Sequence, residues 1–448
     1  MSHQITHLGA EHCVTGSCHL LQVNGLNILI DCGHAQGRDA ALPFEEWPLK
    51  IENIHYLFLT HAHIDHIGRV PDLILRGFSG EIVSTRATKA LVIPMLEDAM
   101  SFSELSSAEV DRVLRQLEAL SRKIDYNTVY ELKQDLRVKC GQAGHILGSC
   151  FLRFEWDNPP FSVVFSGDLG ASHTPILPDP AIPDPCDLLI MESTYGDRCH
   201  QKREERVHNL GAVLTHALSD GGKVFIPAFS MGRTQELVYE IDRLFSEQHW
   251  QEVFPQLRDA QGRIPVVIDS PLGLKIVDIY ADLAEFWDQE AQELFRKGEH
   301  PLDFEGLFSA RDGKAHQQVL DMHGPAVIIA SSGMCSGGRI VNHLREGLGE
   351  PGNDVLFVGY QAVGTPGRDI LKYGRKPNGY VRLRGKKLFI KAGIHQLSGY
   401  SAHADQRDLL NWVNAIPEKS KQIKLIHGDP DAQQHLRTLL RQQGYHVE

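Results

Sequence analysis

The sequence lacks three features that would mark a membrane-bound, exported or disordered protein. No apolar run approaches the ~18 residues of a membrane-spanning helix. Residues 1–13 have no apolar segment of the kind found in signal peptides, and no low-complexity stretch is present. The 8 cysteines are scattered along 448 residues, without the close spacing of a small disulfide-stabilised domain. We therefore predict a cytoplasmic globular protein with reduced thiols and no membrane partner.

An excess of positive charge is also missing. The 45 Lys and Arg residues are outnumbered by 57 Asp and Glu residues, which gives a formal net charge of −12. Bulk attraction to nucleic acid is thereby excluded, but a local basic surface is not. Residues 368–391 contain nine Lys and Arg residues and one acidic residue, Asp369. Histidine, by contrast, is abundant, with 24 residues, and this density suggests metal binding.

The pattern of strands and helices changes twice along the chain. Residues 1–195 contain short apolar strands with turns such as Asn24-Gly25, and residues 87–122 have helical periodicity. Residues 196–385 alternate apolar strands with amphipathic helices, which is typical of a parallel sheet covered on both faces. Short strands return over residues 386–448. The pattern predicts one domain, formed by 1–195 and 386–448, that is interrupted by another.

The strongest chemical motif is His61-Ala62-His63-Ile64-Asp65-His66, which directly follows the apolar run Tyr56–Thr60. A loop after a strand can direct several side chains at one point. Imidazole nitrogens and carboxylate oxygens suit zinc, and the motif offers more of them than one tetrahedral zinc ion with an open position needs. We therefore expect two metal ions.

Three further residues follow predicted strands or glycine turns in the same domain. His145 lies in the glycine-containing turn 144–149, and Asp168 follows the predicted strand 161–165. Asp31 follows the run 28–30, and we expect it to orient a metal-binding histidine or water. Alone, a single histidine or a Gly-Asp turn is more often structural. Beside the motif at 61–66, His145 and Asp168 become candidate metal ligands.

The pattern resembles that of the metallo-β-lactamase superfamily, over residues 1–195 and the return segment 386–448. It consists, in chain order, of Asp31, the motif at 61–66, His145 and Asp168. In that superfamily, two sandwiched mixed sheets flanked by helices hold two zinc ions, which activate a water molecule to attack an ester, amide or phosphodiester. The resemblance implies that one zinc ion is bound by His61, His63 and His145, the other by Asp65 and His66, and that Asp168 bridges them.

Three segments place glycines and an arginine where a predicted strand meets a predicted helix: residues 228–233, 331–339 and 359–368. Such glycines can be simple turns, and the basic segment 368–391 can be a solvated surface. Arginine at a helix N-terminus, however, is unfavourable by about 0.3–1 kcal/mol, so three of them suggest that helix ends and arginines bind anions together. Repeated anion sites fit a phosphate polymer. The candidate phosphate-binding residues are Ser230, Arg233, Ser332, Arg339, Arg368 and Ser401.

Cleavage of a phosphodiester also requires a proton donor for the departing 3′ oxygen. A histidine oriented by a carboxylate serves this purpose near neutral pH. Glu192 and His403 are candidates for such a pair. His427 follows an apolar strand and is a candidate ligand of the second metal ion.

Together these features closely resemble the β-CASP branch of the superfamily, the nucleases of RNA processing that include the catalytic subunit of the pre-mRNA 3′-end cleavage complex. The resemblance spans nearly the whole chain and implies that residues 196–385 are the inserted domain of that branch. It also implies that Glu192, His403 and His427 belong to its three additional motifs. Histidine at the third motif is typical of members that act on RNA.

The sequence therefore predicts an α/β fold, a metallo-β-lactamase αββα sandwich with an inserted α/β β-CASP domain built on a parallel sheet. We expect a zinc-dependent ribonuclease with two Zn²⁺ ions per chain, acting on single-stranded RNA as an endonuclease, a 5′ exonuclease or both. RNA is expected in the cleft between the domains, the product would carry a 5′ phosphate, and a homodimer is compatible with the sequence. The expected catalytic residues are Asp65, Glu192 and His403.

Two other classes of function stay open from the sequence. A small-molecule metallo-hydrolase or a mononuclear iron dioxygenase can share the fold, but Asp65 as a ligand, the Gly-Arg segments and His427 weigh against both. A non-catalytic scaffold subunit of an RNA-processing complex is expected to have lost metal ligands, whereas every candidate ligand is present here.

Overall fold

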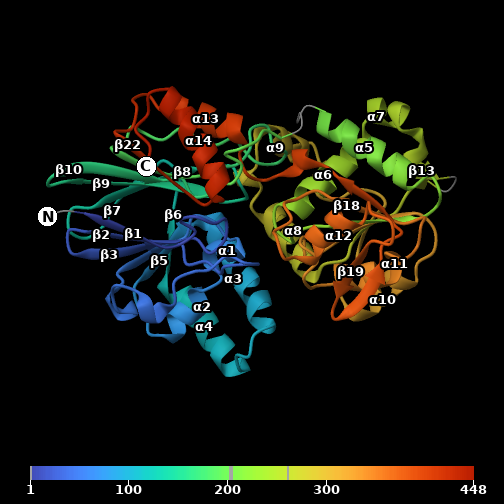
Figure 1. The fold of residues 1–448 in the computed structure, drawn as a ribbon, viewed down its shortest axis with the longest axis horizontal. Coiled ribbons are helices and arrows are strands. Elements are labelled where there is room, and N and C mark those ends of the chain that lie inside the picture. Colours follow the sequence, from blue (N-terminus) through green and yellow to red (C-terminus); the bar gives the residue numbers. More distant parts are fainter. Residues whose placement is uncertain (1–2, 201–204, 260–261) are drawn as a thin grey trace. The chain divides into compact units, whose positions relative to one another are not determined.

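The chain forms two compact units, drawn as a ribbon in Figure 1. The computed structural model describes residues 3–200, 205–259 and 262–448. The first unit comprises Met1–Cys199 and His403–Glu448, and the second comprises His200–Ala402. The sequence predicted the second domain boundary between residues 385 and 386. The structural division falls later because β21 (Gly393–Gln396) pairs in parallel with β18 (Asp354–Phe357) of the second unit.

The first unit is built on two six-stranded sheets. One sheet contains, in spatial order, β1 (Gln4–Gly9), β2 (Cys18–Val23), β3 (Leu26–Ile30), β4 (Tyr56–Phe58), β5 (Glu81–Thr85) and β6 (Ser121–Ile124). The other contains β22 (Gln422–Ile426), β11 (Leu188–Glu192), β10 (Pro160–Phe165), β9 (Cys150–Asp157), β8 (Arg137–Gln142) and β7 (Val129–Glu131). Apolar side chains of both sheets form one buried core, in which the rings of Phe58 and Phe154 meet edge to face at 5.1 Å.

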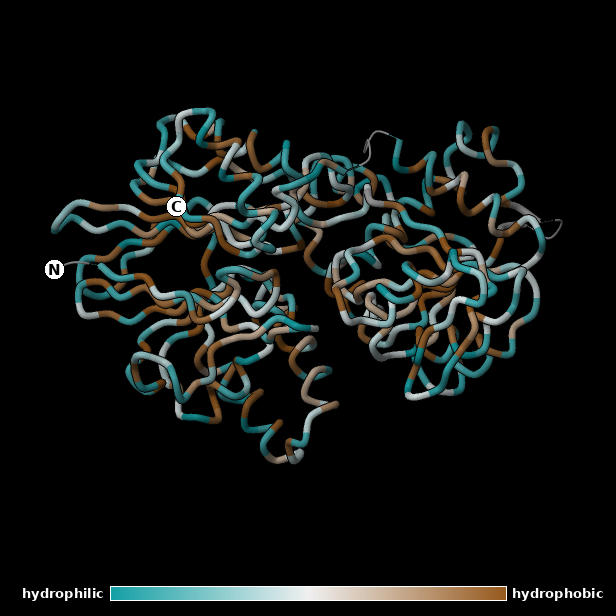
Figure 2. Tube along the Cα trace, in the orientation of Figure 1, coloured by the Kyte–Doolittle hydropathy of each residue, from teal (hydrophilic) through white to brown (hydrophobic). Residues whose placement is uncertain are grey.

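Helices cover the outer faces of these sheets. On the first sheet lie α1 (Ile64–Ile67), α2 (Val70–Leu75), α3 (Arg86–Ser101) and α4 (Ser107–Leu120); on the second lie α13 (Gln406–Ala415) and α14 (Pro430–Gln442). The helices of the second sheet contribute Trp412 and Leu436 to a core shared with Leu189 and Leu425 of that sheet. The predicted αββα sandwich is confirmed, and Figure 2 shows its strands mainly in hydrophobic colours and its surface loops mainly in hydrophilic ones.

Two local predictions in the first unit are confirmed. The Asn24-Gly25 turn joins β2 to β3, with positive φ at both residues as a tight hairpin turn requires. The helical periodicity of 87–122 is also confirmed, and it is divided between two helices. Ser106 and Glu109 form a capping box that begins α4 and separates it from α3.

The second unit is built on a parallel six-stranded sheet. Its strands, in spatial order, are β16 (Leu307–Ser309), β15 (Val266–Ile268), β17 (Ala326–Ala330), β12 (Lys223–Pro227), β18 and β21. Its helices are α5 (Arg206–Ala217), α6 (Arg233–Ser246), α7 (Gln248–Val253), α8 (Pro271–Asp282), α9 (Gln289–Arg296), α10 (Gly313–Asp321), α11 (Ile340–Gly347) and α12 (Pro366–Tyr373). Two short hairpins complete the unit: β13 (Arg258–Asp259) with β14 (Gly262–Arg263), and β19 (Tyr380–Leu383) with β20 (Lys386–Phe389).

Among the described residues, no helix is long and apolar enough to cross a membrane.

Candidate metal centre

The ends of neighbouring strands bring the predicted site residues together in the first unit. Strands β10, β11 and β22 are adjacent and parallel, so their carboxyl ends lie at one edge of the sheet. Asp168 follows β10, Glu192 ends β11, and His427 follows β22. The motif His61–His66 follows β4 of the facing sheet and runs into α1. Residues far apart in sequence therefore meet at one end of the sandwich.

Three histidines and an aspartate form the first cluster. The Nδ1 atom of His63 lies 3.1 Å from Nε2 of His61 and 3.0 Å from Nε2 of His145. Asp168 Oδ2 lies 3.6 Å from both of those Nε2 atoms. His61, His145 and Asp168 are buried, and His63 is half-buried. One ligand atom from each side chain lies within 4.8 Å of the others.

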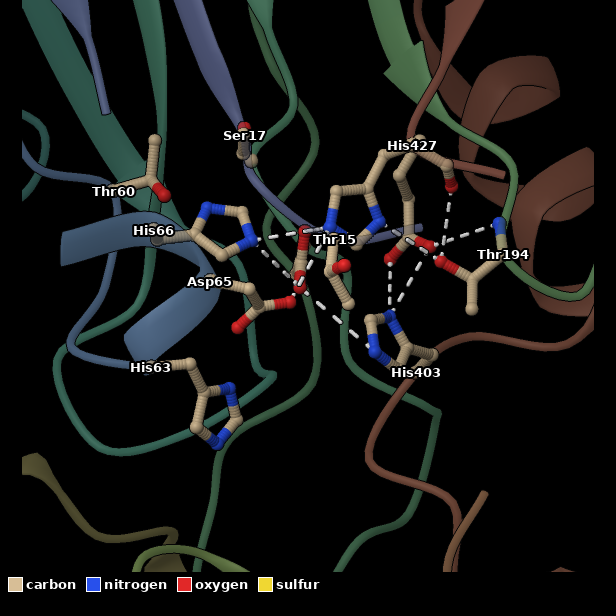
Figure 3. A network of polar contacts seen from close by, with 12 residues as sticks. Thr15, Ser17, Thr60, His63, Asp65, His66, Thr194, His403 and His427 are labelled. Carbon is tan, nitrogen blue, oxygen red and sulfur yellow. Dashed lines mark hydrogen bonds and ion pairs between the residues drawn. The ribbon is translucent and has the colours of Figure 1, made fainter. Parts of the chain in front are cut away.

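The second cluster adjoins the first and shares Asp168 with it. Nε2 of His66 lies 3.2 Å from Nε2 of His427, which lies 3.9 Å from Asp65 Oδ2. Asp168 approaches this cluster as well, with Oδ2 3.3 Å from His66 Nε2 and Oδ1 3.5 Å from His427 Nε2. Figure 3 shows Asp65, His66 and His427 directed toward one another. Asp168 thus faces the nitrogens of both clusters.

The spacing of these atoms fits metal ligation. A tetrahedral zinc ion with nitrogen bonds of about 2.0–2.1 Å holds its ligand nitrogens about 3.3 Å apart, close to the separations of the imidazole pairs. Burial, the largest cause, lowers the pKa of His63 to about 4 and that of His61 well below its ordinary value, so both are neutral, as ligands must be. Oδ1 of the buried Asp168 has no hydrogen-bond donor among the described residues. A metal ion would satisfy this oxygen.

Asp31 contacts His66 and Thr60, and its predicted orienting role stays a prediction. Its carboxylate accepts hydrogen bonds from the amide and the hydroxyl of Thr60, both at 2.8 Å. Its Oδ2 also accepts a hydrogen bond of 2.7 Å from Nδ1 of His66. Because Nδ1 is held in this way, Nε2 of His66 is directed at the second cluster. Thr60 was not identified from the sequence, since a threonine at a strand end carries no distinctive pattern.

Glu192 and His403 form the predicted carboxylate–imidazole pair. Nδ1 of His403 lies 3.2 Å from both carboxylate oxygens of Glu192. The backbone amides of Leu169 and Thr194 donate to these oxygens, at 2.6 and 3.3 Å. The other ring nitrogen, Nε2, lies 3.8 Å from Asp168 Oδ2. Burial disfavours the charged ring, but the carboxylates of Glu192 and Asp168 outweigh it and raise the pKa of His403 to about 9.

His427 also has a partner that the sequence did not indicate. The hydroxyl of Thr194 lies 3.1 Å from Nδ1 of His427, which leaves Nε2 for the second cluster. The backbone of His427 has a φ of 49° and its carbonyl contacts the same hydroxyl at 3.1 Å. Thr194 therefore helps to fix both the ring and the backbone of this residue.

The residues predicted to bind phosphate all belong to the second unit. As expected, α6 and α12 begin at or beside the glycine-containing segments, and α11 begins directly after Arg339. Arg233, however, is buried in an ion pair with Glu236 at 2.6 Å. Arg368 is exposed, Ser332 and Ser401 are half-buried, and the buried Ser230 has its Oγ 3.2 Å from Ser270 Oγ. Their role in phosphate binding stays a prediction.

Arg339 has an internal partner, Asp269, which was not identified from the sequence. Asp269 follows β15 and is fully buried. Its Oδ1 accepts a hydrogen bond of 2.7 Å from Arg339, and its Oδ2 accepts bonds of 2.6 Å from His316 and His343. The carboxylate after an apolar strand is the same pattern that indicated Asp168. Here the pattern marks a buried network in which every carboxylate oxygen has a donor.

We expect Asp269→Ala to destabilise the second unit by about 3–5 kcal/mol, because it leaves the Arg339 guanidinium without its buried partner. Burial raises the pKa of Asp269, but the bonds from His343, Arg339 and His316 outweigh it and lower that pKa below its ordinary value. The stabilisation is therefore complete above about pH 3.9 and is lost as the pH falls through the lowered pKa. Denaturant unfolding at pH 7 and at acidic pH measures both effects.

Asp278→Ala is the matched control in the same unit. Asp278 pairs with Arg311 at 3.2 Å, and both side chains are exposed, 58% and 63%. Such a pair contributes only about 0–1 kcal/mol. Equal destabilisation by the two substitutions at pH 7 would contradict the importance of the buried network.

Comparison with known proteins agrees with this geometry. The metallo-beta-lactamase superfamily model matches residues 13–198, the Beta-Casp domain model matches 234–370, and the Zn-dependent metallo-hydrolase RNA specificity domain model matches 388–448. Two of these descriptions name a metal-dependent family, in accord with the two clusters.

The relatives match over nearly the full chain. Ribonuclease TTHA0252 of Thermus thermophilus is 35% identical over 99% of this chain and 97% of its own. Transcription termination factor FttA of Methanocaldococcus jannaschii is 28% identical over 99% of this chain and 70% of its own. A crystal structure of a protein of unknown function from Enterococcus faecalis has a TM-score of 0.57 at 12% identity, over 99% of this chain and 96% of the other. The chain therefore belongs to the β-CASP family of the metallo-β-lactamase superfamily, as its sequence predicts.

Proposed function

We propose that this protein is a zinc-dependent ribonuclease that binds two Zn²⁺ ions and hydrolyses phosphodiester bonds of single-stranded RNA in cytoplasmic RNA processing or decay. One observation carries the proposal: Asp168 faces two clusters of metal-ligating side chains, and the ring of His403 lies beside it. The name of the Thermus thermophilus relative, ribonuclease TTHA0252, supports RNA as the substrate.

The two metal ions would be held by residues from both sheets of the first unit. His61, His63 and His145 would hold one ion, Asp65, His66 and His427 the other, and Asp168 would contact both. When bound, such ions lower the pKa of water toward neutrality and stabilise negative charge on the phosphoryl oxygens. Asp31 and Thr194 keep the rings of His66 and His427 turned toward this position.

His403 is the proposed proton donor for the departing 3′ oxygen. Glu192 accepts a hydrogen bond from Nδ1 of His403, and the backbone amides that donate to Glu192 hold its carboxylate in place. The Nε2 atom then faces the metal centre, where it donates its proton as the P–O bond breaks. Water adds to phosphorus and the 3′ oxygen leaves as a hydroxyl, so the product carries a 5′ phosphate.

The other functions considered from the sequence fit this geometry less well. A mononuclear site would need only the first cluster, yet the second cluster is complete, with Asp65, His66 and His427 within ligand distance of one another. A non-catalytic subunit has no need of an oriented Glu192–His403 pair. The predicted homodimer stays a prediction, which sedimentation velocity of the purified chain can test.

We expect the zinc-loaded protein to cleave RNA and the chelator-treated protein to lose this activity by at least about 10³-fold, because metal ions supply several kcal/mol of transition-state stabilisation. The assay uses 5′-labelled linear RNA and circular RNA in parallel. Cutting of the circle demonstrates endonuclease activity, and release of labelled mononucleotide from the linear RNA demonstrates 5′ exonuclease activity.

Zinc added back to the stripped protein is the control and should restore the rate. Elemental analysis of the same samples should give about two zinc ions per chain, as the two ligand clusters imply. Full activity of protein shown to be metal-free, or no cleavage of either RNA by protein with both ions bound, would overturn the proposal.

A further inference from the structure

The hairpin β19–β20 of the second unit has two exposed aromatic rings side by side. Tyr380 and Phe389 are cross-strand partners, and their side chains are 45% and 51% exposed. Opposite residues of an antiparallel pair point to the same face, with Cβ atoms about 5 Å apart. Both rings therefore lie on the same outer face of the hairpin, and we call this pair the aromatic surface.

The opposite face of this hairpin anchors it to the second unit. Val381 and Leu383 are only 2% and 1% exposed and join the core that also contains Ile370 and Ile390. Because side chains alternate along a strand, burial of these residues leaves their neighbours on the outer face. The aromatic surface is therefore held on a packed element and not on a free loop.

Two cations share the outer face with the rings. Arg382 and Lys387 are a cross-strand pair and are both exposed. The Lys387 Nζ atom lies 4.2 Å from the ring centroid of Tyr380 and 4.8 Å from that of Phe389. The outer face of the hairpin thus consists of two rings and two cations, with no acidic side chain.

The surrounding segment adds positive charge. Residues 368–391 carry a net charge of +8 in a chain whose total is −12. None of the nine cations forms an ion pair with a carboxylate among the described residues. Their charge is therefore not neutralised within the described part of the protein, and this segment complements a polyanion.

We propose that the outer face of the β19–β20 hairpin, formed by Tyr380, Arg382, Lys387 and Phe389, binds single-stranded RNA. Exposed aromatic rings beside cations suit this ligand, because unpaired bases stack on the rings while the phosphates contact the cations. An acidic peptide would use the cations but not both rings, and duplex RNA hides its base faces. The inference rests on the proposed ribonuclease function. It identifies a surface outside the metal centre that binds the RNA substrate.

The test measures binding of a labelled single-stranded oligoadenylate of about 12 nucleotides to the zinc-loaded full chain by fluorescence anisotropy. Phosphorothioate linkages protect the RNA from cleavage. We expect Tyr380→Ala with Phe389→Ala to raise Kd by at least about tenfold, since base–aromatic stacking is strong. The single variant Tyr380→Phe keeps both rings and should retain most of the affinity. Arg382→Gln with Lys387→Gln should reduce the slope of log K against log salt by about 1.4, at about 0.7 for each phosphate that the protein no longer neutralises.

Matched controls lie on the first unit. Phe102 is 79% exposed, and Arg112 and Arg115 are exposed on α4. Phe102→Ala tests the loss of a surface ring, and Arg112→Gln with Arg115→Gln tests the loss of two surface charges. Both should leave Kd within about twofold and the salt slope nearly unchanged.

The outcomes separate this inference from the proposed function. If the protein cleaves RNA but the hairpin and control variants give the same Kd and salt slope, the inference is wrong and the ribonuclease proposal stands. Duplex RNA of equal length that binds as tightly as the single strand also overturns it, because stacking requires unpaired bases. If the protein cleaves no RNA, the proposed function fails, and the binding comparison still decides whether the hairpin holds RNA.

Discussion

Replacement of Asp168 by alanine is expected to abolish RNA cleavage, by about three orders of magnitude or more, while the fold is retained. Asp168 faces both candidate ligand clusters, with Oδ2 near His61, His145 and His66 and Oδ1 near His427. Its loss removes a ligand from each proposed ion. A defect worth several kcal/mol of transition-state stabilisation corresponds to this loss of rate, at tenfold for about 1.4 kcal/mol.

The fold should survive the substitution because the interactions of Asp168 are with the clusters and not with the core. The surrounding imidazoles hold its pKa well below the ordinary value even though burial opposes the charged form. The carboxylate therefore serves as a negative charge among histidines, which is a requirement of a metal centre and not of the sandwich. The measurements are the cleavage rate of labelled RNA, the metal content by elemental analysis and the far-UV circular dichroism spectrum.

Two further variants complete this experiment. Asp168→Asn retains the shape and removes the charge, so it should lose activity nearly as completely as alanine. Asp111→Ala removes an exposed carboxylate from α4 in the same unit and should cleave RNA at the normal rate. An Asp168→Ala protein that cleaves RNA at the normal rate and has a normal circular dichroism spectrum would contradict the proposal that Asp168 is a metal ligand.

The candidate ligand motif could be predicted from the sequence because it is local. His61–His66 span a single loop and the first turn of α1, so their proximity requires no knowledge of the fold. Asp168, Glu192 and His427 were identified because acids and histidines at the ends of apolar strands meet when the strands are adjacent and parallel, as β10, β11 and β22 are. The parallel sheet of the second unit followed from the alternation of strands and helices over residues 196–385, and the αββα sandwich followed from the resemblance to the superfamily.

Interactions between residues far apart in the sequence could not be predicted in this way. The partner of Arg339 is Asp269, 70 residues away, and no spacing rule connects them. Glu236 lies three residues after Arg233, and this i,i+3 spacing on a predicted helix is a local signal that could have indicated their ion pair. The predicted boundary at 385/386 differs from the structural division after Ala402, because the short strands after residue 385 look alike in both units and only the pairing of β21 with β18 assigns the segment.

Replacement of His403 by alanine is expected to lower the rate of RNA cleavage by about 10²- to 10⁴-fold, the usual contribution of a general acid. The metal content should stay unchanged, since His403 is assigned to proton transfer and not to ligation. A substrate with a p-nitrophenolate leaving group distinguishes this role from a structural one. This anion is stable at neutral pH and needs no proton, so the variant should cleave the nitrophenyl phosphodiester at nearly the normal rate.

The control for this prediction is His435→Ala, which removes an exposed histidine on α14 of the same unit and should leave both substrates unaffected. Equal losses on RNA and on the nitrophenyl substrate in the His403→Ala protein would rule out proton donation. Loss of zinc from that variant would instead indicate that His403 is a metal ligand.

Glu192 should act only through His403, and this dependence gives the sharpest test of the pair. Both carboxylate oxygens of Glu192 lie 3.2 Å from Nδ1 of His403, and backbone amides hold that carboxylate in place. Glu192→Gln should therefore slow RNA cleavage in the wild-type background, by misorienting the ring, and have little further effect in the His403→Ala background. Residues that act as a unit give such non-additive losses. Additive losses in the double variant would show that Glu192 has a separate role, and the carboxylate–imidazole pair would no longer explain protonation of the 3′ oxygen.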